Sequence, residues 1–228
     1  MDDAARMDDF DAPPRAAWFG PLLEKVDLVF EVTGADTPSW PSPHPDRSPL
    51  DEEYSRVSDV GNYRILDARV EAWVRVLAEA GLAVTSDVPS EEWICAARPA
   101  DELSRVRQIR PAARGGLGLL FADTLVDGAP FGLDVGLVRD GERPVTLDCV
   151  PACGCDACDY GSADLIDQLD GWVLTTARGG VVHARLGDHS ATRTIDGWQS
   201  SNGSHEGWLD ESILLPDGVD RWFGEPWR

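Results

Sequence analysis

The stretch that decides the fold is residues 117–150, LGLLFADTLVDGAPFGLDVGLVRDGERPVTLDCV. It contains three apolar runs, Leu117–Val126, Phe131–Val138 and Pro144–Val150, each of a length typical of a β-strand. Turn sequences separate them: Asp127-Gly128-Ala129-Pro130 between the first two, and Asp140-Gly141 before the third. These segments predict an antiparallel meander whose last strand leads directly into a cysteine-rich loop.

Three other segments have the spacing of amphipathic helices. Residues 21–34 begin with Pro21 and end at Gly34, residues 63–80 repeat apolar side chains every three or four positions, and residues 162–176 follow the cysteine loop. Shorter strand signals occur at residues 84–88, 93–98, 181–186 and 191–195. The pattern predicts an α+β fold: a mostly antiparallel sheet packed by two or three helices, with the cysteine-rich loop between a strand and a helix.

The remaining chain indicates the domain organisation. Residues 1–16 are acidic and contain prolines, so we expect a disordered acidic tail followed by a single α+β domain over residues 17–228. Residues 37–49 hold five prolines and cannot be a helix or a central strand. We expect this segment to run over the surface as extended chain, anchored by Trp40.

Charge limits the classes of partner. The formal net charge of −21 disfavours nucleic acid and anionic membranes, because binding to either requires clustered lysine or arginine. The first twenty residues lack the apolar region of a secretory signal, and no stretch approaches the roughly 18 apolar residues of a membrane span. We therefore expect a cytoplasmic protein, in which thiols stay reduced.

The special chemistry of the chain lies in its cysteines. Four of the five, Cys149, Cys153, Cys155 and Cys158, fall within ten consecutive residues. Cys155 and Cys158 have the usual spacing of a metal-binding pair, and Cys153 could supply a third sulfur, with Gly154 permitting close approach of the backbone. Thiolates favour soft metals, so the pattern predicts a zinc site.

The fourth ligand of such a site stays open at this point. Cys149 is a candidate, although it belongs to the predicted strand and is equally compatible with a core position. A remote residue is as plausible, and His183 is the best placed by sequence, with other histidines not excluded.

Redox chemistry is the main alternative to metal binding. The Cys155–Cys158 pair stands shortly before a helix, where the positive helix end lowers a thiol pKa. Asp156, Asp159 and Asp164 surround the pair with negative charge, which raises a thiol pKa but is tolerable beside a bound dication. This argument favours metal over redox, and ordinary core packing of the cysteines is the third alternative.

Three segments of the chain resemble a known family. They are PHPDRSPLDEEYSRVSDVGNYRILDARVEAW at residues 43–73, CGCDACDYGS at residues 153–162, and the closing FGEPW. They are similar to the signatures of an uncharacterised actinobacterial family, a domain of unknown function. The resemblance implies no activity or substrate; it implies that the N-terminal extension is dispensable and that the cysteines at 153, 155 and 158 form the family trio. Two departures are Ala152, where Asp is common in the family, and Tyr160, where Ser is common.

Taken together, the sequence predicts a protein with a structural zinc-binding cysteine loop. Its biochemical role stays open; the first hypothesis is a non-enzymatic binding or interaction module, for which a protein is the candidate partner. The alternative is a thiol-based redox protein or a small-molecule enzyme that uses the same loop. Whether the chain is an enzyme stays open. The loop carries acids but no paired histidines, which favours a structural zinc over a catalytic one.

Overall fold

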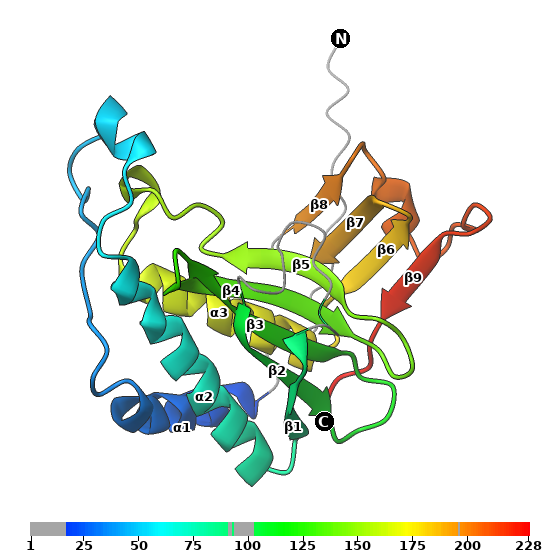
Figure 1. Cartoon of the computed structure of the whole chain (residues 1–228). Helices are drawn as coiled ribbons and strands as arrows, with labels where there is room; N and C mark the ends of the chain where they lie inside the picture. The colour runs from blue at the N-terminus through cyan, green and yellow to red at the C-terminus, as the bar shows by residue number, and fades with distance from the viewer. Residues whose placement is uncertain (1–16, 91–92, 94–102, 196) are drawn as a thin grey trace.

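The structure is a computed structural model and describes residues 17–90, 93, 103–195 and 197–228 (Figure 1). It confirms the α+β fold: the described residues form two antiparallel sheets and three α-helices. The cysteine-rich loop lies between a strand and a helix, as expected. The acidic tail at residues 1–16, and all but Trp93 of the strand expected at residues 93–98, lie outside the described residues.

The first sheet has five strands in the order β1-β2-β3-β4-β5. Their bounds are β1 Ala83–Val88, β2 Leu103–Pro111, β3 Gly118–Val126, β4 Ala129–Val138 and β5 Val145–Val150. The last three form the meander expected from residues 117–150, with Leu119 opposite Leu137 and Leu133 opposite Val150. Because paired residues point to the same face, the meander builds one continuous apolar face.

Helices cover that face. They are α1 Phe19–Thr33, α2 Arg64–Glu79 and α3 Ser162–Ala177, close to the bounds that the spacing predicts. Leu66, Trp73 and Leu77 of α2 and Leu169 and Val173 of α3 join the same core cluster as the sheet, while α1 packs on α2. The opposite face of the sheet carries a smaller cluster around Trp93.

The second sheet has four strands in the order β8-β7-β6-β9. Their bounds are β6 Val182–Leu186, β7 His189–Thr194, β8 Gly197–Ser201 and β9 Asp220–Phe223. The expected hairpin of residues 181–186 and 191–195 is confirmed as β6 and β7. Trp222 of β9 is fully buried in the main core and joins this sheet to the rest of the domain.

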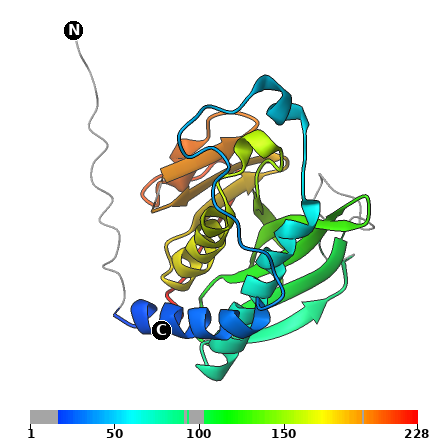
Figure 2. The ribbon, with the colours of Figure 1, turned by 90° about the vertical axis from the view of Figure 1, so that its left-hand side faces the viewer.

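The segment between α1 and α2 has no strand and only two short 3-10 turns, η1 Asp51–Ser55 and η2 Val60–Tyr63. Figure 2 shows this segment leaving α1, passing the N-terminal end of α3 and reaching the cysteine loop. The expectation of an extended surface segment over residues 37–49 is therefore confirmed. No helix in the described residues is long and apolar enough to cross a membrane.

Candidate metal centre

The structure brings the sulfur atoms of Cys153, Cys155 and Cys158 together. All three lie within 4.8 Å of one another, and the Cys153 and Cys155 sulfurs are 3.3 Å apart. A tetrahedral zinc with Zn–S bonds of about 2.3 Å holds its sulfurs about 3.8 Å apart, so small side-chain movements suffice to coordinate an ion. Cys155 is buried, Cys158 half-buried and Cys153 exposed, which leaves one side of the cluster open to solvent.

Local backbone structure produces this arrangement. The single 3-10 turn η5, Asp156–Cys158, folds back so that the Cys158 N–H donates to the Cys155 carbonyl at 3.0 Å. Gly154 packs directly against the ring of Phe131, where an added Cβ would lie only 2.1 Å from a ring carbon. Any other residue here would therefore have to displace either the Phe131 ring or the loop.

Asp156 ties the cysteine loop to the segment before α2. Its carboxylate accepts hydrogen bonds from the Ser58 N–H at 2.7 Å and the Ser58 hydroxyl at 2.8 Å, and forms an ion pair with Arg56. The Asp156 N–H donates to the Arg56 carbonyl at 2.8 Å, and its carbonyl lies 3.0 Å from Nε2 of His44. The loop is thus held from outside by residues about 100 positions earlier in the chain.

A second contact fixes the other end of the loop. The Trp40 indole N–H donates to the Asp159 carboxylate at 2.9 Å, and the Ser162 N–H at the start of α3 donates to the Trp40 carbonyl at 3.0 Å. Gly161 lies between them with a positive φ of 93°, and an added Cβ would meet the Ser42 backbone nitrogen at 2.7 Å. Trp40 is therefore an anchor, as predicted, and it contacts the junction between the cysteine loop and α3.

The acids beside the trio, Asp156 and Asp159, are paired with donors in the structure, which the sequence argument did not anticipate. Partial burial raises the pKa of Asp156, but the hydrogen bonds from Arg56 and Ser58 outweigh it and hold the pKa below its usual value. The Asp156 and Asp159 carboxylates are both engaged with donors of the N-terminal segment. These two acids therefore serve to hold the loop, and neither belongs to the cluster of sulfur atoms.

Hydrogen bonds within the trio shift the pKa values of two of its thiols in opposite directions. Hydrogen bonds from the Cys155 backbone and thiol lower the pKa of Cys153, whereas hydrogen bonding to Cys155 and burial raise the pKa of Cys158 to about 11. The Cys158 thiolate is therefore disfavoured, chiefly because its thiol is hydrogen-bonded to Cys155 and partly buried, with a smaller contribution from like-charge repulsion. A dication removes that penalty, since it binds all three sulfurs as thiolates.

The other two candidate ligands lie elsewhere. The Cys149 thiol, on β5, donates to Oδ1 of Asp134 at 3.2 Å. Nδ1 of His183, on β6, lies 2.9 Å from the Thr192 hydroxyl. Neither joins the group of sulfurs within 4.8 Å, which in the described residues consists of the trio alone. Water or a donor from another molecule would complete a fourfold site at its exposed side.

Comparison with models of known families identifies the family to which the chain is related. Residues 26–222 match the model of DUF6226, described as a family of unknown function. The chain belongs to DUF6226. The resemblance to an uncharacterised family is thereby confirmed, and the match spans the cysteine loop and the segment that holds it. Comparison with curated proteins and with solved structures finds no significant match in either set.

His183 of this DUF6226 chain gives a prediction about pH. Burial, with a smaller contribution from Arg185, lowers the pKa of His183 to about 4, below its usual value near 6.5. As pH falls, the unfolded chain takes up this proton before the folded chain does, so stability is lost between about pH 6.5 and pH 4. The shift corresponds to about 3 kcal/mol of unfolding free energy.

The measurement is chemical denaturation of wild type and His183→Asn at pH 7 and pH 4.5. Asparagine keeps a polar atom near the position of Nδ1, beside Thr192, but does not titrate. We expect the wild type to lose about 2–3 kcal/mol more than the variant over this interval. Equal losses in the two proteins would show that His183 is not the buried neutral imidazole that the structure implies.

Proposed function

We propose that this DUF6226 chain binds one zinc ion through Cys153, Cys155 and Cys158, and that the ion has a structural role. The observation that carries the proposal is the convergence of three sulfurs within 4.8 Å on a loop of six residues. An all-thiolate donor set suits zinc better than magnesium or calcium, which prefer oxygen. The ion would fix the shape of the loop against β4, α3 and the N-terminal segment.

A structural role is favoured over catalysis by the surroundings of the trio. A catalytic zinc needs a general base beside its open position. The nearest acids of the loop, Asp156 and Asp159, are engaged with Arg56, Ser58 and Trp40. The zinc-bound loop would therefore act as a rigid part of a cytoplasmic, non-enzymatic binding module whose partner is a protein, and the charge of −21 disfavours nucleic acid.

Thiol redox chemistry is the second candidate function. Cys153 is exposed, its pKa is lowered, and its sulfur lies 3.3 Å from that of Cys155. In this reaction the two thiols would lose two electrons and two protons, form one S–S bond, and reduce a disulfide substrate to two thiols. This chemistry requires the cysteines to be free of metal.

Native mass spectrometry of the untagged protein, with elemental analysis of the same sample, separates the two functions. We expect a mass excess of one zinc that is lost on acidification, because acid protonates the thiolates. A metal-free mass lower by two hydrogens would support the redox function and overturn zinc binding. A metal-free mass with all thiols reduced would remove the structural zinc as well.

A further inference from the structure

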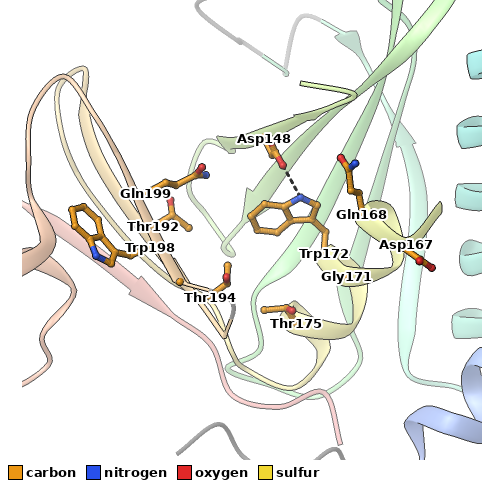
Figure 3. A pocket seen from close by; sticks show the side chains of 11 residues that line it. Asp148, Asp167, Gln168, Gly171, Trp172, Thr175, Thr192, Thr194, Trp198 and Gln199 are labelled. Atoms are coloured by element: carbon orange, nitrogen blue, oxygen red, sulfur yellow. Dashed lines mark hydrogen bonds between the residues drawn. The ribbon is translucent and has the colours of Figure 1, made fainter. Parts of the chain in front are cut away.

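A cavity of about 360 Å³ opens between α3, β5 and the strands β7 and β8 (Figure 3). None of the three clustered cysteines lines it, so it is separate from the candidate metal centre. Figure 3 shows Trp172 and Gln168 of α3 on one side, Thr192 and Gln199 of the second sheet on the other, and Asp148 of β5 between them. The volume lies in the range of small-molecule sites.

The charged side chains that line the cavity are all acidic. Among the described residues that line the cavity there are two carboxylates, Asp148 and Asp167, and no lysine, arginine or histidine. The half-buried Asp148 accepts hydrogen bonds from the Cys149 N–H at 2.8 Å and the Trp172 indole at 3.0 Å. Both donors are neutral, so within the described chain no cation balances this carboxylate. An anionic ligand would therefore be repelled.

Two amides line the cavity, and each donates one hydrogen bond within the protein. The Gln199 side-chain nitrogen donates to the Leu147 carbonyl at 3.1 Å, and the Gln168 nitrogen donates to the Asp164 carboxylate at 2.6 Å. Each amide keeps an oxygen that accepts. Together with the two carboxylates, these oxygens give the cavity several acceptors for a ligand that donates hydrogen bonds.

Trp172 supplies an aromatic wall. Its N–H is already used by Asp148, which holds the ring in place and leaves the π-face for a ligand. A planar cation can stack on an indole face while it donates in pairs to a carboxylate, and guanidinium has this geometry. The geometry points to a binding site for a small molecule that carries a guanidinium group, held by Asp148 and Trp172.

Isothermal titration calorimetry at about 150 mM salt tests the assignment with two probes of the same shape. Butylguanidinium is cationic and butylurea is its neutral counterpart, so the pair isolates the contribution of charge. We expect saturable 1:1 binding of butylguanidinium, at least tenfold tighter than that of butylurea. Equal affinities for the two probes, or saturable binding of glucose without binding of butylguanidinium, would overturn the assignment.

Variants separate a defined site from general attraction to an acidic protein. Asp148→Asn should weaken butylguanidinium binding at least tenfold. Asp167 is exposed and has no side-chain hydrogen bond to the described residues, so Asp167→Asn should fold normally and weaken binding several-fold, which keeps the test valid if Asp148→Asn folds poorly. Asp217→Asn removes the same charge from a distant exposed turn and should leave the affinity unchanged. Equal weakening by Asp217→Asn and Asp167→Asn would show that the probe binds only to the overall negative field.

Discussion

Asp170→Ala is expected to lower the free energy of unfolding by about 3–5 kcal/mol. Asp170 lies on the inner face of α3, where its carboxylate accepts from Nε of Arg69 at 2.9 Å and from the Trp73 indole at 2.6 Å. Arg69 is only 2% exposed. The substitution leaves a buried guanidinium whose remaining ionic partner is Asp27, and it leaves the Trp73 N–H without its acceptor.

Urea unfolding followed by circular dichroism measures this loss against a matched control. Asp167→Ala changes the same residue type on the same helix, but its side chain faces solvent, so we expect a change within about 0.5 kcal/mol. The double substitution Arg69→Met with Asp170→Leu removes both charges and should recover most of the stability. If Asp170→Ala and Asp167→Ala cost the same, the buried pair contributes nothing specific to the fold.

The buried Arg69–Asp170 pair illustrates what sequence periodicity can and cannot predict. Apolar residues at spacings of three and four correctly located α2 and α3, because burial of one helix face dominates their stability. The same spacing treats arginine and aspartate as surface residues. Only the tertiary structure shows that Arg69 and Asp170, 101 positions apart, face each other in the core.

β2 was missed for a related reason. The segment Leu103–Pro111 has three arginines among its nine residues, at positions 105, 107 and 110, so its apolar alternation is weak. In the structure Arg107 is buried with an ion pair to Asp123 at 2.6 Å, an arginine in place of an apolar side chain. The short strands β8 and β9 were not expected either. β8 has a mostly polar sequence, and β9 has only four residues and pairs with β6, which lies far earlier in the chain.

The candidate metal centre was predictable only in part. The sulfur trio is local in sequence, and a turn of three residues brings Cys155 and Cys158 together. The contacts that hold the loop join Arg56 to Asp156 and Trp40 to Asp159, across separations of 100 and 119 residues. Composition marks such residues as polar or aromatic, but sequence spacing carries no information about pairing over this distance.

On the proposal that the trio holds a structural zinc, removal of the metal by a chelator is expected to lower the melting temperature by roughly 10 °C, because binding energy at such a site is folding energy. The Cys155→Ser variant should show the same fall without chelator, since it removes the buried sulfur of the trio. Differential scanning calorimetry measures both. Because the two perturbations act on one site, chelator should have no further effect on the variant.

Cys149→Ser is the matched control for this experiment. Cys149 lies only four residues before the trio, but its thiol bonds to Asp134, and a serine hydroxyl can make the same hydrogen bond. We expect this variant to keep its zinc and to melt within about 2 °C of wild type. Loss of zinc from Cys149→Ser would make Cys149 the fourth ligand, whereas an unchanged melting temperature after chelation of wild type would contradict a structural metal. Additive effects of chelator and Cys155→Ser would place the metal at some other group of residues.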